Sequence, residues 1–443
     1  MKRFFKHIYL TGRFFTSVSI LVLLFIVAYM FPGLLVMVQM LFFVFLGLVM
    51  LDFLLLFKQK GIKASRVLPE KLSNGDDNPI EISLQNNYNF TSHLQIIDEL
   101  PFQYQKRDFG INTELKSQAS KKITYTLRPL QRGEYHFGNL YLYAQSPLSL
   151  VSRRFQFGKD AMVPNYPSFL QLKKYMLLAF SNKIFEYGLK KIRRIGHTME
   201  FEQIKHYVQG DDLRNINWKA TAKSNQLMVN QYQDERSQPV YSVIDKGRVM
   251  KMPFEGLSLL DYAINASLVI SNVALKKQDK AGIFSFSRKV ENRVVAERRP
   301  SQMNIILETL YNLDTDFVES DFSRLYVDIK RHLNERSLLL LYTNFETLDA
   351  LHRQLPYLKA IAKNHLLVVI FFENTELQKL TNKMAKNTYA IFEKTIAEKF
   401  IYEKKLIVNE LQKHGIQSIL TPPEHLTINT INKYLEIKAR GLL

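Results

Sequence analysis

The chain of 443 residues contains no cysteine and one tryptophan, Trp218. Without cysteine there can be no disulfide, no thiol nucleophile and no thiolate zinc site, and this composition fits a reducing compartment. The sequence also lacks a G-x-x-x-x-G-K-[ST] phosphate loop, an H-E-x-x-H zinc helix and a G-x-S-x-G nucleophile elbow. We therefore expect a protein that is not an enzyme and that carries no cofactor.

Acidic residues are few beside the basic ones. The chain has 60 Lys and Arg against 41 Asp and Glu, which gives a formal net charge of +19. Such an excess suggests an anionic neighbour, either nucleic acid or the anionic face of a membrane, and the charge alone does not choose between them. The length is too great for one ordinary core, so two or three folded units are expected.

Charge is almost absent from Phe14 to Phe57, where Asp52 is the single charged residue. The apolar run is broken near its middle by Phe31-Pro32-Gly33, and each half is roughly the ~20 residues needed to cross a bilayer. This pattern predicts two transmembrane helices joined by a tight turn. A cleaved signal peptide is disfavoured, because a second apolar run follows with no small-residue cleavage site between them.

Both flanks of this hairpin are basic, whereas its turn carries no charge. The flanking residues are Lys2, Arg3, Lys6, Arg13, Lys58, Lys60, Lys63 and Arg66. The positive-inside rule therefore predicts an inner-membrane protein whose soluble parts face the cytoplasm. For Asp52 we expect snorkelling or pairing with Lys58 rather than a transport role, since the hairpin offers few polar partners.

A β-rich module is predicted over residues 61–167, where short apolar runs alternate with turn signals such as Asn74-Gly75 and Arg132-Gly133. We interpret it as an interaction or spacer module. The connector that follows begins with the densest basic run of the chain. This run comprises Lys173, Lys174, Lys183, Lys190, Lys191, Arg193 and Arg194. It is interpreted as a solvated face or, alternatively, as a contact with anionic lipid headgroups. Nucleic-acid binding is disfavoured, because no zinc-finger or helix-turn-helix pattern accompanies the charge.

Residues 197–236 form the densest stretch of punctuated polar sequence. The spacing of Phe201, Ile204 and Val208 predicts a short helix that ends at Gly210. Asp211 or Asp212 can cap a second helix that contains Arg214, Trp218 and Lys219. The alternation that begins at Leu227 then predicts a strand.

This stretch resembles the hallmark of the domain-of-unknown-function-58 family, which reads Y-x-x-G-D-D-x-R-x-I-x-W-K-A-[ST]-A after an E-F start. The matching residues are Glu200, Phe201, Tyr207, Gly210, Asp211, Asp212, Arg214, Ile216, Trp218, Lys219, Ala220, Thr221 and Ala222. The resemblance implies a membrane hairpin, a β-rich module and a fold similar to the von Willebrand factor A domain. It also implies partnership with a MoxR-type AAA+ ATPase in chaperone-like assembly or maturation of other proteins. Ser146 and Ser149 depart from the family pattern, which has Asp and Gly at these two turn positions.

The C-terminal part alternates strand and helix, which predicts an α/β fold with a doubly wound, mostly parallel sheet. The predicted divisions are a transmembrane hairpin (1–60), the β-rich module (61–167), the basic connector with the hallmark (168–236) and the α/β domain (237–443).

Ligands in such sheets bind beyond the carboxyl ends of the strands, which directs attention to Asp245 and Thr343. The fold that the resemblance implies usually holds a divalent ion through D-x-S-x-S, a Thr and a second Asp. Here Gly247 and Val249 replace both serines, and no Asp follows Thr343 at the usual place. We therefore expect a degenerate ion site that binds no metal.

For the hallmark, a structural role is favoured over a functional one. The carboxylates would cap a helix, Arg214 and Lys219 would pair with Glu200 or Asp212, and Trp218 would fill the gap between the motif and the sheet. Alternatively, Trp218 anchors a partner surface. Three functions remain open at this point: a membrane-anchored scaffold or adaptor, a divalent-metal-dependent module or hydrolase near Asp245, and a membrane-tethered nucleic-acid binder.

Overall fold

The computed structural model describes residues 7–58, 61–107, 109–158, 160–170, 172, 200–209, 211, 213–224, 226–233, 237–384 and 387–442. The chain divides into two units, Met1–Tyr166 and Pro167–Leu443, and each is described by itself. The predicted basic run at 173–194 lies outside the described residues. So do Gly210 and Asp212, and for Glu200 only the backbone is described.

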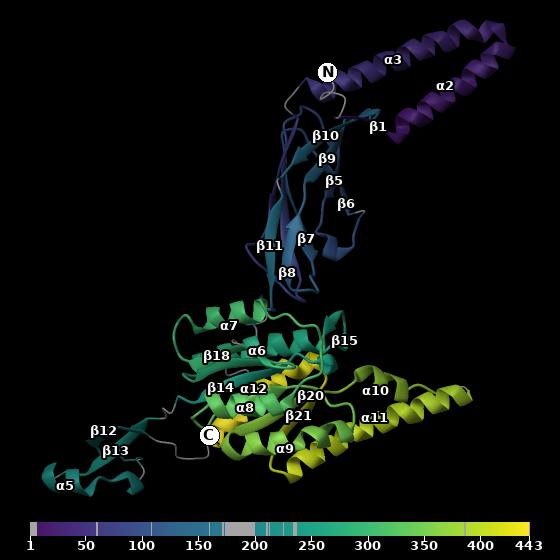
Figure 1. Ribbon diagram of the computed structural model, residues 1–443. Coiled ribbons are helices and arrows are strands. Elements are labelled where there is room, and N and C mark those ends of the chain that lie inside the picture. Colours follow the sequence, from purple (N-terminus) through teal and green to yellow (C-terminus); the bar gives the residue numbers. More distant parts are fainter. Residues whose placement is uncertain are drawn as a thin grey trace. The chain divides into compact units, whose positions relative to one another are not determined.

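A six-stranded sheet forms the centre of the second unit, in the order β18-β17-β14-β19-β20-β21 (Figure 1). All neighbouring strands run parallel except the edge pair β17 and β18. The strands are β14 (Pro239–Asp245), β17 (Lys280–Phe286), β18 (Val290–Glu297), β19 (Leu338–Tyr342), β20 (Leu366–Phe372) and β21 (Gln417–Thr421). This arrangement confirms the predicted mostly parallel sheet.

Helices cover both faces of the sheet, as the continuous apolar strands require. One face packs against α6 (Leu259–Lys276), α7 (Gln302–Tyr311) and α12 (Leu426–Ala439). The other packs against α8 (Phe322–His332), α9 (Leu348–Asn364) and α11 (Thr388–Lys413). Successive residues of β19 alternate between the two cores, with Leu338 and Leu340 in the first and Leu339 and Leu341 in the second. The fold is therefore doubly wound, as predicted.

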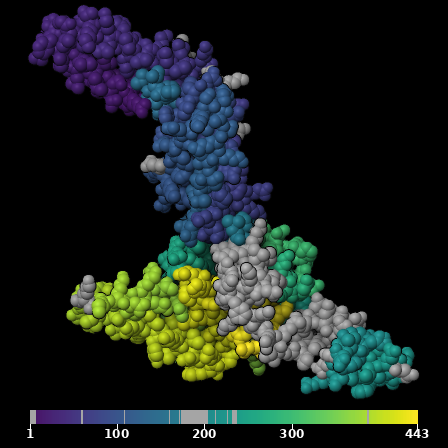
Figure 2. Space-filling model, turned by 180° about the vertical axis from the view of Figure 1, so that it is seen from behind, coloured from purple at the N-terminus to yellow at the C-terminus, as the bar shows by residue number. Residues whose placement is uncertain are grey.

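The segment between β20 and Lys413 contains two helices. They are α10 (Thr375–Thr381) and α11, of which α11 buries only Ala397, Ile407 and Leu411. The N-terminal part of α11 projects from the sheet beside α10, and both are coloured yellow-green in the space-filling view (Figure 2). Its exposed side chains include Tyr389 and Phe392.

Two apolar helices open the first unit, α2 (Gly12–Met30) and α3 (Leu35–Phe57), joined by the turn η1 (Pro32–Leu34). Both are long and apolar enough to cross a membrane. Their side chains are mostly exposed to the surroundings, unlike those of a core helix in a soluble protein. The turn falls where Phe31-Pro32-Gly33 predicted it.

The rest of this unit is all β, as predicted. Three sheets have the orders β1-β10-β9-β5-β6, β2-β4-β7 and β3-β11-β8. The strands are β1 (Ile8–Leu10), β2 (Ile62–Val67), β3 (Leu72–Ser73), β4 (Asn78–Asn86), β5 (Ser92–Asp98), β6 (Gly110–Leu115), β7 (Ser120–Leu127), β8 (Gly133–Phe137), β9 (Leu140–Gln145), β10 (Val151–Phe157) and β11 (Ala161–Tyr166). Alternate residues of β4, such as Ile80, Ile82 and Leu84, point inward to apolar cores.

Asp52, inside the second apolar helix, is fully buried against the β-rich module. Its Oδ2 accepts hydrogen bonds from the backbone N–H groups of Leu150 (2.9 Å) and Val151 (2.8 Å), and its Oδ1 accepts one from the Ser146 hydroxyl. The expected snorkelling or pairing with Lys58 is therefore wrong. The carboxylate is retained inside an apolar helix because it satisfies backbone donors at the start of β10 that would otherwise be buried without partners.

Further bonds tie both ends of the hairpin to the same strand. The strand β1, which precedes α2, pairs antiparallel with β10. At the end of α3, the Leu56 carbonyl accepts hydrogen bonds from Tyr88 Oη (2.7 Å) and Arg153 Nη1 (2.6 Å). The apolar hairpin and the β-rich module are thus joined by polar contacts on both sides of the helices.

We predict that Asp52→Leu destabilises the first unit, although it makes the helix more apolar. The change leaves two backbone N–H groups buried without acceptors, at about 1–3 kcal/mol each. Thermal unfolding of the full chain in detergent, with limited proteolysis near β10, measures the effect. Gln39→Leu, at an exposed polar position of the same helix, is the matched control. A variant Asp52→Leu as stable as the wild type would show that these bonds contribute little.

Candidate functional site

Asp245 ends β14 at the point where the winding of the sheet reverses, between β14 and β19. Its side chain is fully buried. Oδ1 accepts hydrogen bonds from the Gly247 N–H (2.8 Å) and the Ser320 hydroxyl, and Oδ2 accepts one from Thr343 Oγ1 (2.6 Å). The structure thus brings Asp245 and Thr343 together as predicted and adds Ser320, which the sequence analysis missed.

Gly247 is required by the close approach of Ser320 to this carboxylate. A Cβ at position 247 would lie 2.1 Å from Ser320 Oγ and 3.0 Å from Asp245 Oδ1. The first contact is shorter than real Cβ atoms show and the second is tight, so a side chain at position 247 would displace the Ser320 hydroxyl from the carboxylate. Val249 follows in a short 3-10 turn and packs against the apolar core, where it offers no oxygen ligand.

The two basic residues that follow Asp245, Lys246 and Arg248, form no ion pair with its carboxylate among the residues that the structure describes. Lys246 is buried and its Nζ donates to the Glu291 carboxylate and to the Asp314 carbonyl (2.8 Å). Arg248 is exposed. The positive charge of Lys246 is therefore balanced by an ion pair with Glu291 of β18.

Burial raises the pKa of Asp245 above its ordinary value of 3.8, although three hydrogen bonds oppose this effect. A carboxyl group that is easily neutralised in place is a poor ligand for a hard cation, which prefers several charged oxygens. Both oxygens of Asp245 already accept hydrogen bonds, and two of the three donors are the hydroxyls of Ser320 and Thr343. Within the described residues no group of three or more His, Asp or Glu side chains could hold a metal ion. This donor set does not fit the divalent ion that the resemblance associates with the position.

The hallmark stretch folds into a small hairpin, called here the hallmark unit (residues 200–233). Strand β12 (Glu200–His206) pairs antiparallel with β13 (Met228–Gln233), and between them lie the turn η4 (Leu213–Asn215) and the helix α5 (Trp218–Ser224). The predicted strand from Leu227 is confirmed. The predicted helix from Phe201 to Val208 is wrong, because pairing with β13 supplies the backbone partners that a segment this short would not find in an isolated helix.

Asn217, rather than Asp211, caps the helix that carries the tryptophan, and Asp212 lies outside the described residues. Asn217 Oδ1 accepts from the Ala220 N–H (3.0 Å), and its Nδ2 donates to Asn230 Oδ1 on β13 (2.8 Å). Asp211 accepts instead from Lys205 Nζ (2.9 Å) and the Val208 N–H (3.0 Å). The Lys205 hydrogen bond holds the pKa of Asp211 below its usual value. The polar residues of the hallmark therefore fix the loops of the hairpin.

Apolar residues of the same unit are left exposed. Trp218 is 70% exposed, Leu213 64% and Val208 61%, and Ile204 and Leu227 are exposed as well. The expectation that Trp218 fills a gap against the sheet is therefore wrong. Lys219 and Arg214 are exposed and Tyr207 is partly buried, whereas the proposed pairing with Glu200 or Asp212 concerns side chains outside the described residues.

Residues 203–382 match the family described as "Protein of unknown function DUF58". We call this matching part of the chain the DUF58 region. A curated relative, "Uncharacterized protein YeaD" of Bacillus subtilis (strain 168), is 26% identical over 257 residues, which cover 56% of this chain. The match spans 62% of that relative's length, less than two thirds of it. The DUF58 region thus includes most of the hallmark unit and both Asp245 and Thr343.

Solved structures similar to parts of the chain include the SpRpn10 VWA domain and the CARDB domain of PF1109 from Pyrococcus furiosus. The VWA domain is 10% identical with a TM-score of 0.28, and the match covers 44% of this chain and 94% of that domain. The CARDB domain is 12% identical with a TM-score of 0.17, and the match covers 24% of this chain and 91% of that domain. We draw no functional conclusion from either likeness.

We predict that the stability of the DUF58 region depends on pH through Asp245. The folded state raises the pKa of this carboxyl group. Its contribution to the free energy of unfolding is therefore fully present at pH values below the pKa of the unfolded state, and it is lost as the pH rises through the pKa of the folded state. The free energy of unfolding of the wild type should therefore fall, relative to that of Asp245→Asn, as pH rises from about 4. Asparagine keeps the shape and can donate to Thr343. Denaturant unfolding of the full chain in detergent measures both curves, and parallel curves would contradict the assignment.

Proposed function

We propose that the protein is a membrane-anchored scaffold or adaptor whose hallmark unit binds a protein partner. The supporting observation is that Trp218, Leu213, Val208 and other apolar side chains are all exposed on one hairpin of about thirty residues. Exposed apolar residues that are scattered singly are ordinary, whereas several gathered on one small unit are typical of interaction sites. Tryptophan and arginine are also the residue types that dominate binding energy in protein interfaces, and Arg214 lies four positions before Trp218.

The internal bonding of the hallmark unit supports the same proposal. Asn217, Asp211 and Thr221 hold the loops through hydrogen bonds within the unit, so the exposed apolar groups are carried on a preformed framework. A preformed surface loses less conformational entropy on binding than a disordered one. The polar residues of the motif would then position the surface, and the apolar ones would bind.

The partner we propose is a MoxR-type AAA+ ATPase, which is what the DUF58 resemblance implies, acting in assembly or maturation of other proteins. The chain has no phosphate loop of its own, so work driven by ATP would come from the partner. The protein itself would not be an enzyme. The alternative of a metal-dependent module loses support from the donor set around Asp245, and the alternative of a nucleic-acid binder rests on net charge.

We predict that Trp218→Ala weakens capture of the partner by about tenfold or more, as expected for a central interface tryptophan. The full chain, solubilised in detergent, is used to recover partners from its own cell lysate with and without ATP. Phe102→Ala removes an exposed aromatic side chain from the other unit and is the matched control. Equal recovery by Trp218→Ala and the control, or recovery of nucleic acid in place of an ATPase, would count against the adaptor.

We also propose that both ends of the hairpin, and hence both soluble parts, lie in the cytoplasm, on the basis of the basic flanks. The absence of cysteine allows a direct test. Gly33→Cys places a thiol in the turn, where a Cβ meets no atom within 4 Å, and Asn334→Cys places one in an exposed loop of the second unit. A membrane-impermeant maleimide added to intact cells should label the first and spare the second. The reverse labelling would invert the proposed orientation.

A further inference from the structure

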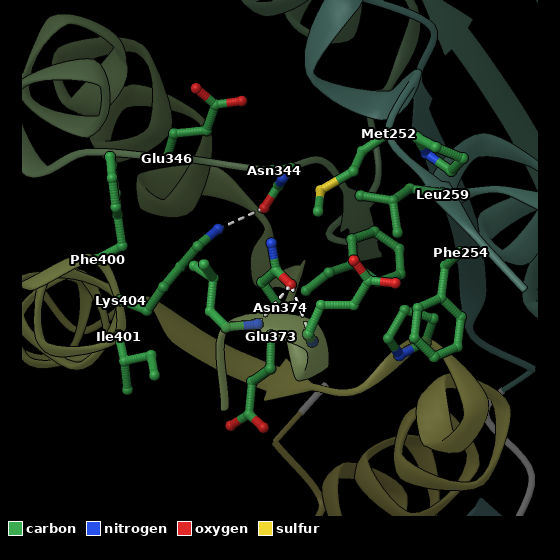
Figure 3. Close-up of a pocket in the computed structure, with 15 residues that line it drawn as sticks. Met252, Phe254, Leu259, Asn344, Glu346, Glu373, Asn374, Phe400, Ile401 and Lys404 are labelled. Atoms are coloured by element: carbon green, nitrogen blue, oxygen red, sulfur yellow. Dashed lines mark hydrogen bonds between the residues drawn. The ribbon is translucent and has the colours of Figure 1, made fainter. Parts of the chain in front are cut away.

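A pocket opens at the carboxyl ends of β19 and β20, next to α11 (Figure 3). Its volume is about 330 Å³, in the lower range of small-ligand sites. The walls are mainly apolar. They include Met252, Phe254, Leu259, Phe372, Phe400 and Ile401. Lys404 of α11 reaches into this pocket toward Asn344, as the dashed contact in Figure 3 indicates.

Lys404 brings a positive charge into these apolar surroundings with little to balance it. Its Nζ donates to Asn344 Oδ1 at 2.6 Å and lies 5.6 Å from the centroid of the Phe371 ring. An ammonium group has three N–H donors, so one acceptor leaves capacity for more. Within the part of the chain that the structure describes, no carboxylate forms an ion pair with Lys404. This partly buried side chain thus lacks the ion-pair partner that a cation in apolar surroundings normally requires.

The electrostatics agree with this geometry. Burial lowers the pKa of Lys404 to about 8, and the nearby charge of Glu346 opposes the shift only in part. A cation whose desolvation exceeds its compensation is stabilised when an anionic group enters beside it. The remaining N–H donors of Lys404 therefore favour an anion or another strong hydrogen-bond acceptor.

Three glutamates near the pocket limit what that anion can be. Glu346 and Glu376 are exposed, so water screens them, and Glu373 accepts a hydrogen bond from Gln378 Nε2 at 3.2 Å. These glutamates would repel a polyanion such as a nucleotide. A ligand with a single carboxylate can place its one negative charge at Lys404, away from Glu346 and Glu376. The apolar walls require that the rest of the ligand be apolar.

We propose that this pocket binds an apolar carboxylate about the size of one amino-acid residue. Its carboxylate accepts from Lys404 and from the Asn344 amide, and its apolar body packs against Phe372 and Phe400. Two sources share this chemistry, a free small carboxylic acid and the C-terminal residue of a protein chain. The site is separate from the Asp245 cluster and from the hallmark unit, so it does not depend on the adaptor function.

Calorimetric titration of the full chain in detergent at pH 7 tests the proposal with four probes. The probes are 3-phenylpropionate, its neutral amide, a short peptide ending in phenylalanine with a free carboxylate, and the same peptide amidated. We expect at least one carboxylate probe to bind about tenfold or more tightly than its amide, because the charged contact is lost in the amide. Binding of the free acid alone identifies a small-molecule site, and binding of the free-carboxylate peptide identifies a chain terminus.

Matched variants assign the effect to Lys404. Lys404→Met should weaken carboxylate binding by about tenfold or more, whereas Lys405→Met, at the exposed neighbouring lysine, should not. Phe400→Ala, which keeps the charge, should weaken binding of acid and amide alike, and thermal unfolding checks that each variant is folded. At pH 8 binding should also take up protons in the wild type and in Lys405→Met but not in Lys404→Met, measured in buffers of different ionisation enthalpy. Equal affinity for acid and amide, unchanged binding by Lys404→Met, or no binding of either acid at millimolar concentration would overturn the proposal.

Discussion

Double coverage of the central sheet is the constraint on which the second unit depends. Helices bury both faces of β14, β19 and β20, so most side chains along these strands are apolar and the charged and amide groups stand where the strands end. Asp245, Thr343 and Asn344 all stand at that edge. Asp245 accepts hydrogen bonds from Thr343 and Ser320, and these bonds hold the ends of the strands in place. Asn344 instead accepts a hydrogen bond from Lys404, whose ammonium group has further N–H donors. One edge thus contains a closed polar cluster and an open one.

The first unit must also place a polar group among apolar ones, here a carboxylate within an exposed apolar helix. A carboxylate in an apolar helix is costly unless its oxygens are fully used, and Asp52 uses both of them on Ser146 and on the backbone of β10. The same hydrogen bonds shield the Asp52 carboxylate from the apolar surroundings and supply acceptors for the backbone N–H groups at the start of β10. Ser146, where the family pattern has Asp, fits this arrangement because its hydroxyl can donate to Asp52, whereas a second carboxylate would need a proton to do so.

Much of the fold could be predicted because its periodicity is local. Continuous apolar runs such as Leu338–Tyr342 mark buried parallel strands, and the Phe31-Pro32-Gly33 break marks the turn of the apolar hairpin. The errors arose where partners distant in sequence decide the outcome. Residues 200–206 pair with β13, Ser320 reaches Asp245 across 75 positions, and Asp52 meets Ser146 across 94. Lys404 gave no signal at all, because its burial depends on the packing of α11 over the carboxyl edge.

The charges and the exposed apolar groups of this protein imply different kinds of contact. Long-range attraction from a net charge of +19 is screened within about 10 Å at ordinary salt, so it can gather anionic surfaces but discriminates poorly among them. Binding through Trp218 and its apolar neighbours depends instead on the area removed from water, which salt does not weaken. Specific recognition is therefore better supported at the hallmark unit, where apolar groups stand on a bonded framework, than along any basic surface. In the proposed adaptor, the excess of positive charge would hold the protein near an anionic membrane, and the hallmark unit would select the partner.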